Sequence, residues 1–176
     1  EFHTIRRQLD RLDEEGVVEV VKVSACPVGD IAGKLEAQVD DRTAAVLVSA
    51  VLFERGLLVP GLDRVAAACE RHGAALLVDA YHALGAVPFP LRALGLDGAY
   101  VVGGGYKYLQ MGEGNCFLRT PPGCELRPVL TGWFAEFGGL AAAKTPGAVR
   151  YGKGAARFAG ATFDPTSAYR GAAVLD

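Results

Sequence analysis

Short runs of apolar residues, separated by segments with helical periodicity, limit how this chain can fold more than any other feature. Residues 44–50 and 74–78 are such runs, and a continuous apolar run is typical of a strand buried on both faces. Between them a helix is predicted from Pro60 to about His72, ending at Gly73, because proline favours a helix start and glycine a helix end. Alternating strands and helices predict an α/β fold with a mostly parallel sheet covered by helices.

The same kind of pattern extends along the rest of the chain. Strands are predicted at residues 17–23, 98–102 and 116–119, and a helix is predicted at residues 30–39 with Asp30 capping its first turn. A short helical turn is predicted at residues 89–94 and a further helix at residues 169–175. Residues 120–154 combine proline, glycine, alanine and isolated aromatic residues, which indicates a long loop on a surface or against a partner subunit.

The composition narrows the possible classes of function. Hydrophobic residues make up 51% of the 176 residues, which is enough for one core, and 18 Lys and Arg are matched by 20 Asp and Glu. This balance does not favour nucleic acid or a membrane surface as a partner, and no apolar run approaches the roughly 20 residues that cross a bilayer. The four cysteines lie far apart without metal-ligand spacing. We therefore expect buried free thiols, no metal and a cytoplasmic protein, with a disulfide pair as the alternative.

Three polar residues stand at the ends of predicted strands: Ser49, Asp79 and Lys107. Ligands of an open parallel sheet bind beyond the carboxyl ends of its strands, so all three are expected to point into one cleft. Asp79 directly follows an apolar strand, and a partly buried carboxylate is expected to have a cationic partner. Lys107 follows glycines at residues 103–105, which are expected to let the backbone approach a ligand, and a lysine so placed suits Schiff-base chemistry.

Each of these residues also has an ordinary structural interpretation. Asp79 alone is equally consistent with a strand-end cap or an ion-pair member, Lys107 with a solvated loop lysine, and His82 with a structural histidine. The glycine triplet does not match GxGxxG, and no GxxxxGK[ST] segment occurs, so nucleotide binding has little support. The combination of Asp79 and Lys107, more than either residue alone, indicates a site.

Three motifs follow one another in the sequence: LVDAYHALG at residues 77–85, GYKYL at residues 105–109 and TGWF at residues 131–134. Together they resemble kynureninase and its class V aminotransferase relatives, over about residues 2–167. The resemblance implies the large domain of a fold-type-I pyridoxal-phosphate enzyme, with pyridoxal 5'-phosphate as cofactor and an amino acid as substrate. It also implies a homodimer with shared active sites.

The resemblance further implies roles for individual residues. Lys107 would bond the cofactor as a Schiff base and Asp79 would pair with its protonated pyridine nitrogen, so these two are the implied catalytic residues. The other implied cofactor-binding residues are the ring neighbour His82, the phosphate ligand Tyr106, the stacking residue Phe2, the nearby hydroxyl residue Thr4, and Trp133, which would reach the phosphate region of the neighbouring subunit.

Two positions depart from the family's pattern. Tyr81 stands where the family usually has alanine, which predicts either a tilted cofactor ring or a narrower pocket. Asp164 precedes Pro165 where kynureninases have asparagine or threonine, which predicts an altered substrate preference.

The resemblance also suggests how the chain relates to a whole enzyme. The family's N-terminal phosphate-binding loop would precede Phe2 and its small domain would follow Asp176, so residues 1–176 are interpreted as the central portion of the cofactor-binding large domain. The first functional hypothesis is kynureninase-like hydrolytic cleavage of a β-acyl amino acid. The alternatives are an aminotransferase or desulfurase of the same fold, and a catalytically inactive fragment or pseudoenzyme with an assembly role.

Overall fold

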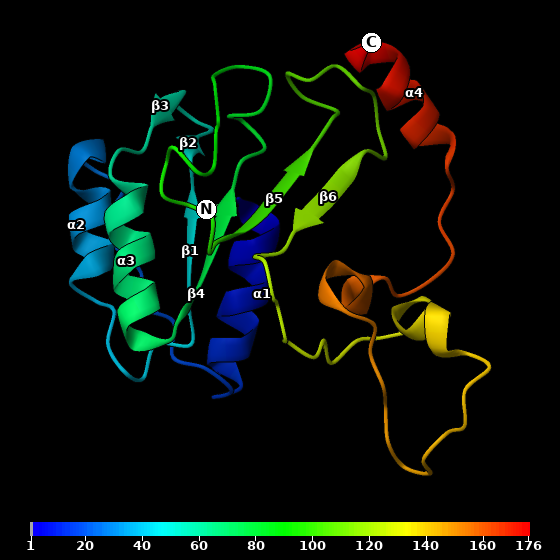
Figure 1. The fold of residues 1–176 in the computed structure, drawn as a ribbon. Coiled ribbons are helices and arrows are strands. Elements are labelled where there is room, and N and C mark those ends of the chain that lie inside the picture. The colour runs from blue at the N-terminus through cyan, green and yellow to red at the C-terminus, as the bar shows by residue number, and fades with distance from the viewer. Residues whose placement is uncertain (1) are drawn as a thin grey trace.

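A computed structural model describes residues 2–176 (Figure 1). Its main sheet consists of the strands β1 (Ala45–Ser49), β4 (Ala75–Asp79), β5 (Tyr100–Gly104) and β6 (Cys116–Arg119), in the order β1-β4-β5-β6. The strands β1, β4 and β5 are parallel, and β6 pairs with β5 in the antiparallel direction. The predicted α/β class with a mostly parallel sheet is therefore confirmed.

Helices lie on both sides of this sheet. The helices α2 (Ile31–Glu36) and α3 (Leu62–His72) lie on one side, and α1 (His3–Glu14) lies on the other (Figure 1). Successive side chains of a strand point to opposite faces: in β4, Leu76 and Val78 are buried, whereas Leu77 and Asp79 are partly exposed. The main core thus lies between the sheet and the pair α2 and α3, while the other face of β4 stays partly open beside α1.

Glycine marks both ends of α3. The flanking residues Gly61 and Gly73 have φ angles of 76° and 68°, a left-handed conformation that glycine adopts without steric cost. The N–H of Gly73 donates to the carbonyl groups of Cys69 and Glu70, which would otherwise lack a partner at the helix end. The predicted helix is confirmed, with its start at Leu62.

The strand predicted at residues 17–23 is wrong. The segment pairs with no other strand among residues 2–176, and Val21 is 58% exposed. The N–H of Val20 donates to the Asp13 side chain of the preceding helix instead. A β-rich run becomes a strand only where a neighbouring edge offers hydrogen bonds, and a local pattern does not reveal whether that edge exists.

The helix α1 is absent from the sequence prediction, although its signal is present. The apolar residues Ile5, Leu9 and Leu12 follow helical spacing. The side chains of Arg6 and Asp10, one turn apart, form an ion pair at 3.7 Å that supports the helix. This helix contributes directly to the site described below.

Smaller differences concern turns and short elements. The helix predicted at residues 30–39 is confirmed as α2, but Asp30 ends a preceding 3-10 helix, η1 (Val28–Asp30), and its side chain makes no cap hydrogen bond. The predicted helical turn at residues 89–94 is a turn without a helix. A hairpin of β2 (Val51–Leu52) and β3 (Leu57–Leu58), which is not predicted, follows β1.

Residues 120–154 are mainly loop, as predicted, and contain the 3-10 helix η2 (Trp133–Gly139). A second 3-10 helix, η3 (Gly154–Phe158), carries the buried Arg157, which donates to the carbonyl of Leu126 at 2.9 Å. The chain then forms α4 (Thr166–Leu175), which confirms the helix predicted at residues 169–175.

The cysteines are free thiols, but only two of the four are buried. Cys69 and Cys124 are buried, whereas Cys26 and Cys116 are exposed, so the expectation of four buried thiols is half right. Within residues 2–176 no helix combines the length and apolar character needed to span a membrane. The described His, Cys, Asp and Glu side chains form no group that could hold a metal ion.

Candidate active site

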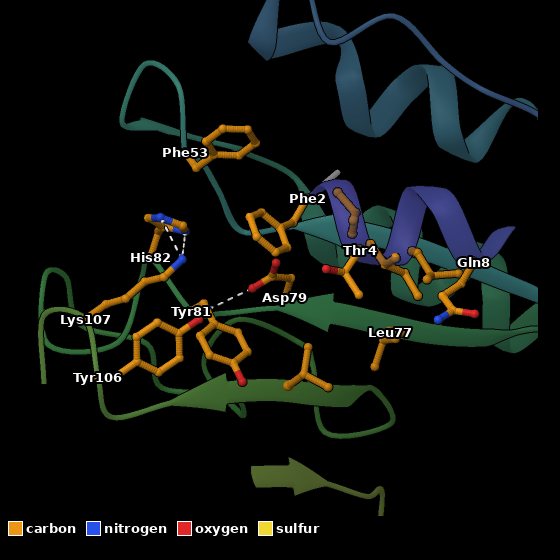
Figure 2. A pocket seen from close by; sticks show the side chains of 14 residues that line it. Phe2, Thr4, Gln8, Phe53, Leu77, Asp79, Tyr81, His82, Tyr106 and Lys107 are labelled. Carbon is orange, nitrogen blue, oxygen red and sulfur yellow. Dashed lines mark hydrogen bonds between the residues drawn. The ribbon is translucent and has the colours of Figure 1, made fainter. Parts of the chain in front are cut away.

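A cavity of about 400 Å³ opens beside the carboxyl ends of β4 and β5 (Figure 2). Side chains from α1, from the sheet and from the loops after β2, β4 and β5 form its wall. They are Phe2, Thr4, Ile5, Gln8, Leu47, Val48, Phe53, Leu77, Asp79, Tyr81, His82, Val102, Tyr106 and Lys107. The cavity therefore contains one lysine amine and one carboxylate among mainly apolar and aromatic groups.

Lys107 lies in the connection between β5 and β6, three residues beyond the end of β5. Its Nζ lies 3.1 Å from Nε2 of His82, and a protonated amine can only donate in this contact. The same Nζ lies 5.5 to 5.7 Å from the ring centres of Phe2, Tyr81 and Tyr106, within the range of cation–π attraction. The amine is thus held among aromatic rings rather than extended into solvent.

Asp79 is the last residue of β4, and its carboxylate faces the cavity (Figure 2). Its Oδ1 accepts a hydrogen bond of 2.9 Å from the N–H of Tyr81. The expected cationic partner is not found, because no Lys, Arg or His of the described residues forms an ion pair with Asp79. The carboxylate is only partly buried, and one main-chain N–H together with solvent access is sufficient to tolerate its charge.

His82 is held beside Lys107 by apolar contacts. Its ring centre lies 6.1 Å from that of Phe53 and 6.2 Å from that of Tyr108. Burial lowers the pKa of His82, the positive charge of Lys107 lowers it further, and the carboxylate of Asp79 partly opposes both effects. The imidazole is therefore neutral at pH 7 and can accept a hydrogen bond from the lysine.

The charges of Lys107 and Asp79 act on the His82 pKa in opposite directions, which predicts how His82 titrates in the cofactor-free protein. We expect its pKa to lie below the usual 6.5. Lys107→Met should raise this pKa, because a neighbouring positive charge is lost, and Asp79→Asn should lower it further, because a negative charge is lost. Titration of the imidazole signals by NMR measures both shifts, and shifts of the opposite sign would contradict the described arrangement of charges.

The three glycines before Lys107 make room for side chains. A Cβ at Gly103 would lie 2.5 Å from Cδ1 of Leu84, and one at Gly104 would lie 2.5 Å from Cε1 of Tyr81. Real Cβ atoms do not approach other atoms so closely, so larger residues at these positions would displace the packed side chains. The expectation that the glycines admit a ligand to the backbone is thus replaced by a packing role.

Tyr81, which stands at the family's alanine position, turns its ring toward β5. The ring lies over Gly104, 5.5 Å from the ring of Tyr106. Burial, followed by a hydrogen bond with the thiol of Cys116, raises the pKa of the Tyr81 hydroxyl. The ring forms part of the wall of the cavity.

The remaining residues expected in the site divide into two groups. Phe2, Thr4 and Tyr106 line the cavity, and Phe2 packs edge-on against Phe53 at 6.2 Å. Ile5, Gln8 and Phe53 also line it, but they are absent from the sequence prediction. The helical spacing of residues 3–14 is the signal that could have indicated Ile5 and Gln8.

Three other residues do not line the cavity. Ser49 is paired with Asp79 in the parallel sheet, so the two side chains lie on the same face, but Ser49 is buried and is not among the residues that line the cavity. Trp133 is 51% exposed and packs against Phe134. Asp164 accepts hydrogen bonds from the main chain and hydroxyl of Thr166 at the start of α4, which lowers the pKa of its carboxyl group.

Comparisons of the sequence give partial matches. No protein-family model matches the chain. Kynureninase of Pseudomonas fluorescens is 34% identical over 106 residues, which cover 58% of this chain and 25% of that protein. The uncharacterized aminotransferase YcbU of Bacillus subtilis strain 168 is 31% identical over 142 residues, which cover 80% of this chain and 36% of that protein.

Solved structures match over nearly the whole chain. The apo cysteine desulfurase of Thermococcus onnurineus NA1 has a TM-score of 0.71 at 19% identity, covering 99% of this chain and 42% of its own. The chain has the fold of the fold-type-I pyridoxal-phosphate enzymes. A NifS-like protein of the same fold matches with a TM-score of 0.64 at 21% identity, over 98% of this chain and 41% of its own. This fold-type-I chain therefore spans between a quarter and about two fifths of the four proteins named here.

Proposed function

We propose that the cavity binds pyridoxal 5'-phosphate and that the protein acts on an amino acid. The observation that carries the proposal is that an amine, Lys107, and a carboxylate, Asp79, line one cavity among aromatic rings. A lysine amine bonds an aldehyde, a carboxylate keeps a pyridine nitrogen protonated, and aromatic faces accept a planar ring. The residues present fit this cofactor, and the kynureninase and aminotransferase relatives support it.

Each residue of the cavity has a proposed role in binding the cofactor or in moving a proton. Lys107 would hold the cofactor at its aldehyde carbon with loss of water, and its amine, once replaced by the substrate amine, would take up and return a proton at the substrate α-carbon. When bound, the cofactor supplies an electron sink, which the negative charge of Asp79 sustains. The neutral ring of His82 accepts a hydrogen bond from Lys107 and so orients the amine. The proposed supporting roles are stacking by Phe2, a nearby hydroxyl from Thr4, and a phosphate contact from Tyr106.

Within this class, kynureninase-like hydrolytic cleavage of a β-acyl amino acid is the first proposal. Its support is the identity of 34% to kynureninase over 106 residues. In such a reaction Lys107 would move protons at the substrate, and the apolar walls of the cavity would restrict the access of water to the reacting carbon.

Aminotransferase chemistry is the second proposal, because the match to YcbU covers a larger part of this chain. Desulfurase chemistry has less support: it would need a cysteine near the amine, and none of the four described cysteines lines the cavity. A catalytically inactive fragment or pseudoenzyme is the remaining alternative, and cofactor binding separates it from the enzymes.

We further propose that residues 1–176 are the central portion of a cofactor-binding large domain. The partial coverage of kynureninase, YcbU and the cysteine desulfurase supports this assignment. A cytoplasmic location is proposed from the four free thiols, which persist in a reducing compartment.

Absorbance spectroscopy tests the proposed function most directly. The protein is purified with pyridoxal 5'-phosphate, and a visible band beyond that of the free cofactor is expected, which Lys107→Ala should remove. Candidate amino acids are then added singly, and anthranilate, alanine, keto acid and sulfide are measured. Anthranilate with alanine supports the hydrolase, a keto acid supports the aminotransferase, and the absence of any protein-bound band would contradict the whole proposal.

The exposed aromatic segment around Trp133 supports a homodimer with shared sites. Trp133, Phe134 and Phe137 form a cluster with ring centres 4.5 to 5.4 Å apart, and the nearby Val129 and Leu130 are 95% and 92% exposed. Apolar groups so exposed are typical of an interaction surface. In the proposed dimer, Trp133 offers its indole N–H to the phosphate group in the partner's cavity.

Subunit mixing tests this dimer. Lys107→Ala and Trp133→Ala chains, each nearly inactive alone, should recover about half of the native activity per mixed dimer, because one of the two sites is intact. Activity is measured on dimers separated by different affinity tags, with mixed native and Lys107→Ala chains as the matched control. A monomer at working concentration, or verified mixed dimers without recovery, would contradict the shared site.

A further inference from the structure

Lys107 lies in a closed loop whose shape depends on contacts far along the chain. The loop connects β5 to β6 and is closed at its base by Gly105, whose N–H donates to the Asn115 carbonyl at 2.9 Å and whose carbonyl accepts from Met111 at 2.8 Å. Within the loop the N–H of Gln110 donates to the carbonyl of Lys107 at 3.1 Å. The outgoing half carries Lys107, and the returning half runs from Met111 to Asn115.

The helix α4 holds this returning half through side chains that donate to its carbonyl groups. Nε of Arg170 donates to the Met111 carbonyl at 2.9 Å, and a second nitrogen of the same guanidinium donates to the Glu113 carbonyl. One turn earlier, the hydroxyl of Ser167 donates to the Gly114 carbonyl at 3.3 Å. The planar guanidinium group suits two such acceptors at once, since its donors point in fixed directions.

Three glycines allow this close approach. A Cβ at Gly112, where φ is +70°, would lie 2.7 Å from Nε of Arg170, and one at Gly114, where φ is +91°, would lie 3.0 Å from Cβ of Ser167. On the helix, a Cβ at Gly171 would lie 2.5 Å from Cε of Met111. The loop and the helix therefore fit each other only with glycine at these positions.

The Met111 side chain lies between α4 and the start of the Lys107 loop. Its Cε touches Gly171 of α4, and its Cβ would lie 2.6 Å from a Cβ at Gly105, two residues before Lys107. Moving α4 would therefore move the Met111 side chain and, with it, the start of the Lys107 loop.

The remaining surface of α4 makes few such contacts. Gly171 is its buried residue, while Tyr169 and Leu175 are 76% and 69% exposed. Among the described residues no carboxylate forms an ion pair with Arg170, so its positive charge is directed at the loop carbonyl groups. Hydrogen bonds from a charged donor are stronger than those from a neutral one.

We propose that Arg170 is a positioning residue that holds the Lys107 loop in the shape that points the amine into the cavity. The proposal deepens the proposed function, since it concerns the same lysine. Its contacts with the loop can nevertheless be measured without cofactor, because the loop hydrogen bonds are present in the protein itself.

Hydrogen exchange of the full chain without cofactor tests the contact first. In Arg170→Ala the amides of Gly105, Gln110 and Met111 should exchange about tenfold faster, the effect expected from losing hydrogen bonds to a charged donor. Arg170→Lys, which retains the charge but not the two-pronged geometry, should fall between this variant and the native protein. Arg42→Ala removes another exposed arginine, from a surface ion pair with Glu19, and is the matched control, expected to leave these amides unchanged.

Reaction of Lys107 with pyridoxal 5'-phosphate tests the consequence. The rate of covalent attachment, followed by borohydride reduction and peptide mass spectrometry, should fall about tenfold in Arg170→Ala and remain native in Arg42→Ala. Unchanged exchange in both Arg170 variants, or faster exchange with native attachment rates, would overturn the positioning role. If the native protein itself attaches no cofactor, the proposed function fails. The positioning role is then tested by the rate at which formaldehyde and borohydride methylate the Lys107 amine. This rate should likewise fall about tenfold in Arg170→Ala and remain native in Arg42→Ala.

Discussion

Lys107→Ala should abolish covalent attachment of pyridoxal 5'-phosphate and lower kcat/KM at least about 10³-fold. The physical reason is that the lysine amine has two proposed tasks, to bond the cofactor aldehyde and to move a proton at the substrate. Alanine removes both and also leaves His82 without the donor that lies 3.1 Å from its ring. Turnover of the substrate identified by product analysis measures the loss of rate, and absorbance measures the loss of attachment.

Borohydride reduction and peptide mapping of the native protein provide the control. The reduced adduct is expected on Lys107, and Lys34→Ala should label as the native protein does, because the Lys34 amine bonds to the Cys26 carbonyl outside the cavity. An adduct found mainly on Lys22, Lys34, Lys144 or Lys153 would show that the amine has been assigned to the wrong residue.

Asp79→Asn should bind the cofactor but lose turnover by about 10²- to 10⁴-fold. Asparagine has nearly the same shape and can still accept the hydrogen bond from the Tyr81 N–H, so the change mainly removes the negative charge. Without that charge a pyridine nitrogen in the cavity would lose its proton, and the electron sink would weaken. Absorbance measures bound cofactor, and stopped-flow kinetics with substrate measures the chemical step.

A comparison with Asp79→Ala separates charge from local structure. Alanine also removes the acceptor for the Tyr81 N–H, so we expect weaker cofactor binding in addition to slow turnover. Near-native activity of Asp79→Asn with the cofactor bound would exclude the electron-sink role of this carboxylate.

The parts of the fold that the sequence predicts correctly have strong local signals. The strands β1, β4 and β5 are short, mainly apolar runs because one face packs in the main core and the other lines the partly open cavity beside α1. The helix α3 ends at Gly73 because the residue there has a φ of 68°. The wrong strand at residues 17–23 has an equally strong local signal. Residues 17–23 differ from the correctly predicted strands in having no neighbouring strand among the described residues to pair with. The presence of such a neighbour is a non-local property.

The glycine triplet before Lys107 illustrates the same limit. Sequence reasoning correctly expects crowding at residues 103–105 but assigns it to a ligand. In the structure side chains of the protein itself crowd these positions: Leu84 and Phe117 at Gly103, Tyr81 at Gly104, and Met111 at Gly105. Which group approaches a glycine depends on how the neighbouring loops and strands pack, and residue type alone does not specify it.

The sequence by itself determined the α/β class, the placement of Asp79 at the end of one strand and that of Lys107 soon after another, because strand periodicity and chain order are local properties. Only the tertiary structure decided what surrounds them. The contact of Lys107 with His82 joins residues 25 positions apart, and that of Arg170 with Met111 joins residues 59 positions apart. Phe2 reaches the cavity because α1 lies against the sheet face opposite α2 and α3 (Figures 1 and 2). Such contacts follow from the packing of elements that are distant in sequence, which no local pattern records.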